Sequence, residues 1–291
     1  MSPGVSPGAA LRAAAGKLGL DPGGARPAGG SAFRLSDGTR SVFLKILPAA
    51  LAACLEAEAE GLDALAGPLR VPAVLGRGEA ADEAWLALEW LELRRPDAAA
   101  AEAFGHALAQ SHQRTAEAFG WQADNWIGAS PQHNGWEDDW ATFFTERRLR
   151  PQFDAARERG GDGLAEAGER LCAAVPALLE GHAPPASLVH GDLWGGNWGA
   201  LGPGAPVTFD PAVHYADREC DLAMTELFGG FPATFYAAYR EAWPLPPGYA
   251  GRRDLYQLYH VLNHDNLFGG GYGARARALT ETLLRRVPGS G

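Results

Sequence analysis

One segment of the chain combines residue types that suit phosphoryl transfer. It runs from Leu188 to Asn197 and contains His190, Asp192 and Asn197 in the pattern His-x-Asp-Leu-x-x-x-Asn. An aspartate in this position can orient an attacking hydroxyl toward a phosphorus atom, and an asparagine five residues later can fold back onto a metal ion. The two glycines before Asn197 permit the tight turn that this requires. We therefore predict Asp192 as the catalytic residue and Asn197 as a ligand of Mg²⁺.

A second acidic residue completes the metal site expected for this chemistry. Asp210 ends the short apolar run that begins at Val207, and it follows Asp192 as the second metal-binding aspartate follows the catalytic loop in protein kinases. Taken singly, Asp192, Asn197 and Asp210 would suit a turn, a loop and a strand end. Because all three occur in this order with a short hairpin between them, we predict Asp210 as the second Mg²⁺ ligand.

A single lysine interrupts the apolar run 42–47. Lys45 would be costly there unless it were paired, although a lysine on an edge strand can also extend to water. Kinases place a strand lysine on the ATP phosphates and hold it with a helix glutamate. Of the three glutamates on the next predicted helix, we choose Glu58, because Leu62 and Leu65 would share its inward face.

Two further segments are predicted to contact ATP. The first ends the last strand before the linker and would offer backbone hydrogen bonds to adenine; it comprises Glu89, Trp90 and Leu91. The second precedes the strand at Ala32 and would cover the phosphates; it comprises Gly29, Gly30 and Ser31. The pattern Gly-x-Gly-x-x-Gly does not occur there. The Gly/Pro cluster that begins at Pro22 and includes Pro27 is by itself more typical of a turn.

Aromatic and polar residues that could bind a sugar gather in the second half of the chain. Aromatic faces suit the C–H surfaces of a sugar, while amides and carboxylates suit its hydroxyls. The alternative for most of these residues is packing in a helical core. The substrate candidates are Trp194, Asn125, Trp136, Asp217 and His264.

The surrounding elements predict an α+β fold with two lobes. Strands are expected at 32–35, 42–47, 71–75 and 84–91, with a helix at 49–66. Helices are expected at 98–118, 138–158 and 163–181 and over most of 217–286, with short strands in the loop 188–209. We therefore predict a small antiparallel-sheet N-lobe with one helix (1–92), a larger, mostly helical C-lobe (93–291), and a nucleotide-binding cleft between them.

Composition narrows the possible partners and location. The net charge is −10, which argues against a nucleic-acid partner. The three cysteines are far apart and form no CxxC pair, so neither a disulfide framework nor a zinc site is expected. The sequence has no signal-peptide layout and no apolar run long enough to cross a membrane. These features predict a cytoplasmic protein without membrane contact, and they leave its oligomeric state open.

The chain resembles the fructosamine-3-kinase (ketosamine-3-kinase) family over nearly its whole length. This family is related to aminoglycoside and choline kinases and has a protein-kinase-like fold. The similarity rests on these segments: 189–197, 209–213, 217–231, 134–149 and 263–272. The glycine-rich entry of the family is present only in shortened or shifted form, as Gly29-Gly30-Ser31-Ala32-Phe33-Arg34.

The resemblance implies an ATP- and Mg²⁺-dependent kinase that phosphorylates the sugar 3-hydroxyl of ketoamines, including fructosamines and ribulosamines. Phosphorylation there labilises the adduct, so the implied role is deglycation of amines, with glycated lysine or protein as a possible substrate. Carried over, Asp192 is the catalytic base, Asn197 and Asp210 bind Mg²⁺, and Lys45 anchors the phosphates. The segment 217–219 supports the metal and catalytic loops.

Two other functions remain open from the sequence. The wider fold also serves kinases for other small hydroxylated amines, such as an aminoglycoside or choline. A non-catalytic nucleotide-binding protein on the same scaffold would be expected to lose one of the four residues with catalytic roles. All four are present, so the shortened glycine loop is the only feature in favour of that reading.

Overall fold

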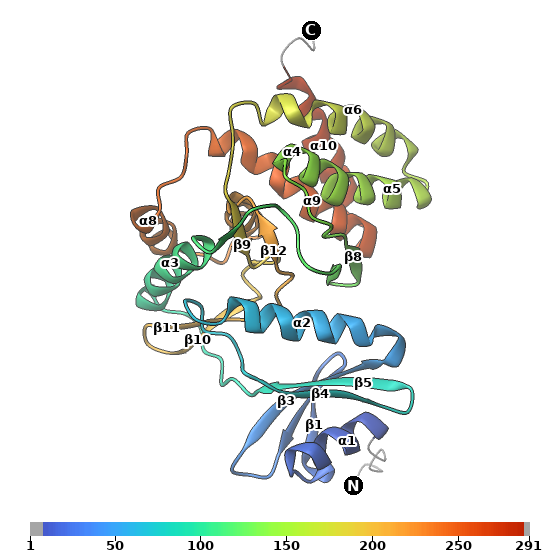
Figure 1. Ribbon diagram of the computed structural model, residues 1–291, viewed down its shortest axis with the longest axis vertical. Helices are drawn as coiled ribbons and strands as arrows, with labels where there is room; N and C mark the ends of the chain where they lie inside the picture. Colours follow the sequence, from blue (N-terminus) through green and yellow to red (C-terminus); the bar gives the residue numbers. More distant parts are fainter. Residues whose placement is uncertain (1–7, 288–291) are drawn as a thin grey trace.

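The computed structural model describes residues 8–287, and its N-terminal part is built on a five-stranded antiparallel sheet (Figure 1). The strand order is β1-β2-β3-β5-β4. The strands are β1 (Ala25–Gly29), β2 (Ala32–Ser36), β3 (Ser41–Pro48), β4 (Val74–Ala80) and β5 (Glu83–Glu89). The antiparallel sheet agrees with the prediction, which missed β1 and placed at 71–75 the strand that the structure has at Val74–Ala80. Pro27 and Gly29 disfavour a strand there, and the pairing of β1 with β2 overrides that local preference.

Two helices, rather than the single predicted one, cover this sheet. Helix α2 (Ala52–Leu65) lies between the sheet and the rest of the molecule, whereas α1 (Ala9–Leu18) covers the opposite face (Figure 1). Val42 and Leu44 of β3 pack in the cluster that includes α1, and Phe43 packs in the cluster of α2. Burial on both faces explains the continuous apolar run, and alternation along the strand places Lys45 on the α2 side.

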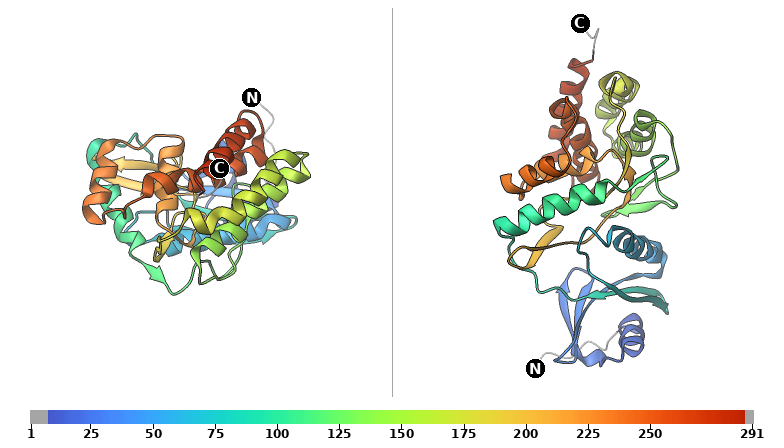
Figure 2. Two further views of the ribbon diagram at one scale, coloured as in Figure 1. Left: turned by 90° about the horizontal axis from the view of Figure 1, so that it is seen from above. Right: turned by 60° about the vertical axis from the view of Figure 1, so that its left-hand side comes forward.

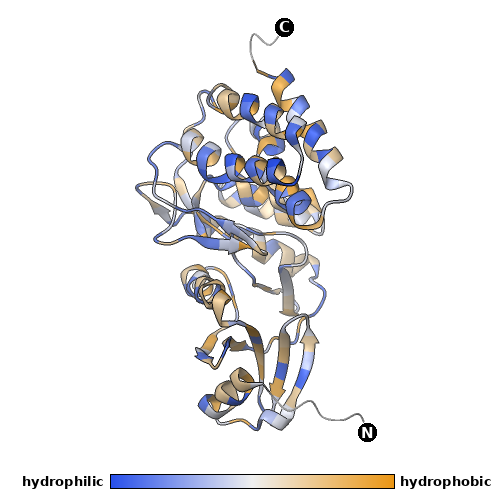
Figure 3. Ribbon diagram, turned by 90° about the vertical axis from the view of Figure 1, so that its right-hand side faces the viewer, coloured by the Kyte–Doolittle hydropathy of each residue, from blue (hydrophilic) through white to orange (hydrophobic). Residues whose placement is uncertain are grey.

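The remainder of the chain is mostly helical, as predicted (Figure 2). Its helices are α3 (Ala98–His112), α4 (Trp140–Phe144), α5 (Arg150–Glu158), α6 (Asp162–Leu178), α7 (Glu219–Leu227), α8 (Ala233–Ala242), α9 (Tyr249–Phe268) and α10 (Tyr272–Arg285). The helix expected at 98–118 ends early, since the chain joins a small sheet at Thr115. The helix expected at 138–158 contains a π-turn over Thr145–Leu149. Hydrophilic and hydrophobic residues share these helices, as amphipathic packing requires (Figure 3).

Short strands frame the predicted catalytic loop. β6 (Thr115–Ala116), β9 (Ala186–Val189) and β12 (His214–Ala216) form one sheet in the order β12-β9-β6. β10 (Trp198–Gly202) pairs with β11 (Ala205–Thr208), and β7 (Asn125–Ile127) pairs with β8 (Ser130–Gln132). The catalytic loop therefore leaves β9 and enters β10, and both of its ends are held by strand pairing.

Residues 90–97 connect the sheet to α3, which begins at Ala98. The division of the chain at residue 92 lies within this connection, and we retain it as a proposal. Between residues 8 and 287, the model contains no helix with the length and apolar character needed to cross a bilayer.

Helix α3 packs closely on α8 through a glycine. A Cβ atom on Gly105 would lie 2.4 Å from the main-chain oxygen of Phe235. Backbone cannot yield to such a contact as a flexible side chain can, so the two helices require glycine at this position. The packing matters for the site because His112, at the end of α3, reaches the catalytic loop through Asp221.

We predict that Gly105→Ala lowers the free energy of unfolding by about 2 kcal/mol, because the added methyl group overpacks the α3–α8 contact. The matched control is Gly163→Ala in α6, where a Cβ atom would meet nothing within 4 Å. Alanine favours a helix over glycine, so the control should be neutral or slightly stabilising. Urea unfolding curves of the two variants check this, and equal midpoints would contradict the proposed packing.

Candidate active site

The loop between β9 and β10 brings Asp192 and Asn197 together. Nδ2 of Asn197 donates to the main-chain oxygen of Asp192 at 2.9 Å and to its Oδ2 at 3.1 Å. Burial raises the pKa of Asp192 to about 7, and the carboxylates of Asp210 and Asp221 act in the same direction, against the hydrogen bond from Asn197. The hydrogen bonds from Asn197 thus hold the Asp192 segment and its carboxyl group in place.

Lys45 joins three segments that are distant in sequence. Its Nζ lies 2.7 Å from Oε1 of Glu58 on α2 and 2.5 Å from Oδ1 of Asp210, just beyond β11. The sequence-based choice of Glu58 agrees with this contact, since the neighbouring Glu56 pairs with Arg77 instead. Although burial lowers it, the two carboxylates raise the pKa of Lys45 above its ordinary value.

Asp210 has a left-handed backbone, with φ of +54°. This conformation is uncommon for residues other than glycine, although aspartate tolerates it better than most. The Asp210 side chain is 48% exposed and lines the cleft. The turn thus presents a carboxylate to the cleft beside Lys45.

Asp221 supports the catalytic loop from behind, a role that the sequence analysis did not assign. Its buried carboxylate accepts hydrogen bonds from the main-chain nitrogens of His190 (2.7 Å) and Gly191 (2.9 Å). The imidazole of His112 lies 3.0 Å away. Gly191 has a φ of +82°, and a Cβ atom there would lie 2.1 Å from the oxygen of Ala212, so the loop needs glycine at this point.

Two adjoining cavities share Asp210. One, of about 410 Å³, is lined by polar groups that include Lys45, Asp192 and Asn197. The other, of about 440 Å³, has a more apolar wall that includes Phe43. The polar cavity, which contains the ammonium group of Lys45, adjoins the apolar cavity. This pair of cavities fits a nucleoside triphosphate, with the phosphates in the polar cavity and the base in the apolar one.

The donor set also fits Mg²⁺. Carboxylate and amide oxygens are the ligands this ion prefers. Asp210 supplies an accessible carboxylate, and Asn197 uses its Nδ2 as a donor, which leaves Oδ1 for a ligand.

Most of the residues predicted to contact the nucleotide line one of these cavities, whereas Gly29 and Gly30 do not. The hinge residues line the apolar cavity; they are Glu89, Trp90 and Leu91. The side chain of Glu89 pairs with Arg70, and its main-chain nitrogen donates to the oxygen of Ala73 at 2.9 Å. Gly29 and Gly30 lie at the turn of the β1–β2 hairpin with positive φ, and Ser31 lines the polar cavity.

Of the five predicted substrate residues, the structure brings two to the cleft. Trp194 lines the polar cavity and is 39% exposed. Asn125 also lines it, but its amide is used internally: it donates to the oxygen of Val213 and accepts from Gln132 and Asn134. It therefore holds the β7–β8 hairpin against the segment that follows Asp210.

The other three lie outside the residues that line this cavity. Trp136 is half-exposed and packs near Tyr215. His264 bonds to the oxygen of His260 and packs against Phe228, whose ring also meets that of Trp194. His264 therefore lies beside the site and is separated from Trp194 by the ring of Phe228.

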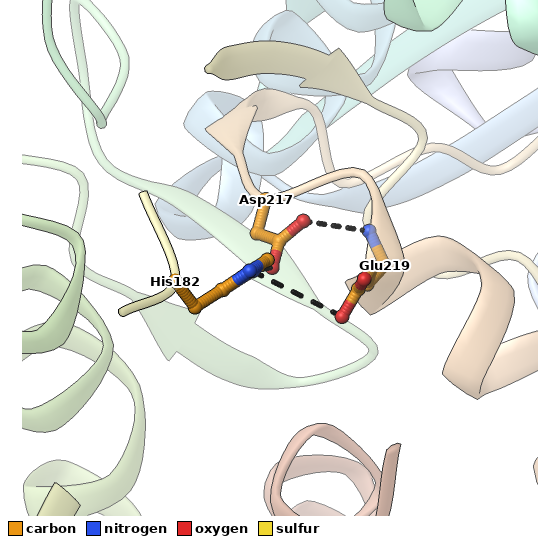
Figure 4. Close-up of side chains that lie close together, drawn as sticks. All are labelled: His182, Asp217 and Glu219. Atoms are coloured by element: carbon orange, nitrogen blue, oxygen red, sulfur yellow. Dashed lines mark hydrogen bonds and ion pairs between the residues drawn. The ribbon is translucent and has the colours of Figure 1, made fainter. Parts of the chain in front are cut away.

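Asp217 is buried, which corrects its prediction as a substrate residue. It forms a cluster with His182 and Glu219 in which one ligand atom from each lies within 4.8 Å of the others (Figure 4). Such a group could in principle hold a metal ion, but Arg252 binds both oxygens of Glu219 at 2.7 Å, and Asp217 accepts from Tyr256 at 2.6 Å. Bonds within the protein therefore account for the cluster.

We predict that Asp221→Asn lowers the free energy of unfolding by about 3 kcal/mol at pH 7, because it removes a buried charge that accepts two main-chain hydrogen bonds. Although burial raises it, the hydrogen bond and charge of His112 hold the pKa of Asp221 below its ordinary value. The stabilisation is therefore fully present above about pH 4 and is lost as the pH falls further.

Urea unfolding at pH 7 and at pH 3.5 tests this prediction. The difference in free energy of unfolding between the wild type and Asp221→Asn should be smaller at the lower pH. Asp63→Asn, on the exposed face of α2, is the control and should change little at either pH. A gap of equal size at both pH values would argue against the charge as the stabilising feature.

Comparison with known proteins agrees with this geometry. Residues 26–286 match the sequence model of the fructosamine kinase family. A probable ketoamine kinase of Synechocystis sp. is 47% identical over 256 residues, which cover 87% of this chain and 86% of that protein. A chloroplastic protein-ribulosamine 3-kinase of Arabidopsis thaliana is 38% identical over 85% of this chain and 77% of its own.

Solved structures show the same fold. A candidate fructosamine-3-kinase from Haemophilus somnus superposes with a TM-score of 0.84 at 29% identity, covering 94% of this chain and 96% of its own. An aminoglycoside phosphotransferase in a ternary complex with AMP-PNP and hygromycin B has a TM-score of 0.62 at 15% identity, over 97% of this chain and all of its own, which shows a shared kinase-like fold. On its sequence and its fold, this chain belongs to the fructosamine kinase family.

Proposed function

We propose that this protein transfers the γ-phosphate of ATP to the sugar 3-hydroxyl of a ketoamine in a Mg²⁺-dependent reaction. The observation that carries the proposal is the meeting of Lys45, Asp192, Asn197 and Asp210 at one cleft in a member of the fructosamine kinase family. Phosphoryl transfer depends on positioning and charge neutralisation, and these four side chains supply both.

Each of the four side chains has a distinct proposed role. Lys45, held by Glu58, binds the α- and β-phosphates and fixes their position. Asn197 and Asp210 hold Mg²⁺, which neutralises phosphate charge when it is bound. Asp192 accepts a hydrogen bond from the sugar hydroxyl and aligns its oxygen with the γ-phosphorus.

The acceptor side of the cleft suits a sugar. Trp194 and Trp126 line the polar cavity, and their ring faces can pack on sugar C–H groups. We propose fructosamines and ribulosamines as acceptors, with the amine being free or part of a glycated lysine. Phosphorylation of the 3-hydroxyl would labilise the adduct and release the amine, which is a deglycation.

We expect ADP release with Mg²⁺-ATP in the presence of ribulosyl-lysine, fructosyl-lysine or a synthetic fructosamine. An aminoglycoside and choline belong in the same panel, since the fold alone would also serve those acceptors. Turnover on an aminoglycoside or choline without any on the ketoamines would replace the proposal with that alternative. Nucleotide binding without turnover on any acceptor would favour a non-catalytic role.

We predict that Asp192→Asn lowers kcat at least about 10²-fold on the preferred ketoamine, because the hydroxyl loses its oriented acceptor. The substitution keeps the size of the side chain, so the unfolding midpoint should stay close to that of the wild type. Asp138→Asn, an exposed change outside the cleft, is the control and should retain normal turnover. A near-normal kcat for Asp192→Asn would contradict the role of this residue.

A further inference from the structure

Helix α2 carries Glu58. The negative charge of this helix leaves its C-terminal end, where carbonyl groups lack partners, in need of a cation. The helix contains four acidic residues and no basic ones; they are Glu56, Glu58, Glu60 and Asp63. The last carbonyl groups of any helix lack partners within the helix and carry the negative end of its dipole. A cation from elsewhere in the fold is therefore favoured at the C-terminal end of α2.

Arg114 supplies this cation from the C-terminal part of the chain. Its Nη2 donates to the oxygen of Ala64, and its Nη1 lies 3.5 Å from the oxygen of Ala66. Ala64 lies in the last turn of α2, and Ala66 is the residue that caps it. The guanidinium thus binds the free carbonyl end of the helix that holds Lys45 in place.

The main chain of Arg114 contacts the catalytic side of the site. Its oxygen accepts a hydrogen bond from the nitrogen of Leu188 at 2.9 Å. Leu188 belongs to β9, the strand that leads directly into the catalytic loop, and the residue after Arg114 begins β6, which pairs with β9. One residue therefore links the end of α2 to the strand that precedes Asp192.

Packing along α2 shows why its position matters. A Cβ atom on Gly61 would lie 3.2 Å from Pro211 and 3.3 Å from Val213, so the middle of the helix rests on the segment that follows Asp210. Glu58 lies one turn before this contact and Arg114 binds one turn after it. A shift of the C-terminal end of α2 would therefore move Glu58 relative to both Lys45 and Asp210.

We propose that Arg114 is a positioning residue for nucleotide binding. It fixes the end of α2 against β9, and this sets the position of the Lys45–Glu58 pair relative to the catalytic loop. The proposal rests on the proposed function, because it takes the cleft beside Lys45 to be the phosphate site. Arg114 touches neither Lys45 nor Asp192 in the structure, and it acts through Glu58.

The test measures binding of magnesium AMP-PNP by titration calorimetry, which requires no acceptor. Arg114→Met keeps an unbranched apolar stem and removes the guanidinium. We expect its Kd to rise roughly tenfold, because Glu58 and with it Lys45 are no longer held where the phosphates bind. The matched control is Arg40→Met. Arg40 donates to the oxygen of Leu18 at 2.7 Å, so it binds the end of α1 on the far face of the sheet. Its Kd should stay within about twofold of the wild type.

A double variant separates positioning from general destabilisation. In a Glu58→Gln background, Arg114→Met should change the Kd less than about twofold, because the group through which it acts is already gone. Equal effects of Arg114→Met and Arg40→Met, or an undiminished effect in the Glu58→Gln background, would overturn the proposal.

Three further outcomes are decisive. If Arg114→Met does not fold, Arg114→Lys takes its place: it keeps the charge but loses the two-pronged contact, and a Kd equal to that of the wild type would overturn the proposal. If the wild type itself binds no AMP-PNP, the proposed kinase function fails. Normal binding by the wild type with no effect of Arg114 variants would overturn the role of Arg114 and leave the kinase function standing.

Discussion

The candidate active site is organised around one ammonium group placed between two carboxylates. Lys45 comes from the sheet, Glu58 from α2 and Asp210 from the turn after β11, and the contacts of 2.7 and 2.5 Å require all three elements to be in place together. Without the lysine, two carboxylates would face each other in a partly buried space, which is costly. The relative position of the sheet, α2 and the catalytic segment is therefore constrained at a single point.

Further into the protein than Lys45, buried polar groups hold the catalytic loop and its surroundings in place. Asp221 binds two main-chain nitrogens of the catalytic loop, and the pair of Glu219 with Arg252 lies further back in the helical part. Such groups are expensive to bury unless every partner is satisfied, and here bonds within the protein supply the partners. The arrangement gives the loop a fixed geometry that hydrophobic packing, which has no direction, would not provide.

The sequence predicted those features that depend on local spacing and missed those that depend on distant partners. The order of Asp192, Asn197 and Asp210 is local, and the contact of Lys45 with Glu58 followed from strand and helix periodicity. Helix α1 was missed because its alanine-rich sequence has little polar contrast, and its burial depends on the far face of the sheet. Asp221 lies within the segment 217–231 that resembles the family, but its role depends on main-chain nitrogens 31 and 30 residues away along the chain. Asp217 was predicted at the substrate because sequence alone does not distinguish a buried acid from an exposed one.

The left-handed backbone of Asp210 is a local cost in stability at a residue proposed to be needed for activity. A non-glycine residue in this conformation costs about 1 kcal/mol or more, and the residue also places a carboxylate beside that of Glu58. A glycine would relieve the backbone strain, but it would also remove the ion pair with Lys45 and the proposed metal ligand. The strain is therefore kept at a position where one carboxylate both pairs with Lys45 and is proposed to bind the metal ion, so a gain in backbone stability there would come at the expense of the site. The folded chain thus carries local backbone strain at the residue that is proposed to bind the metal ion.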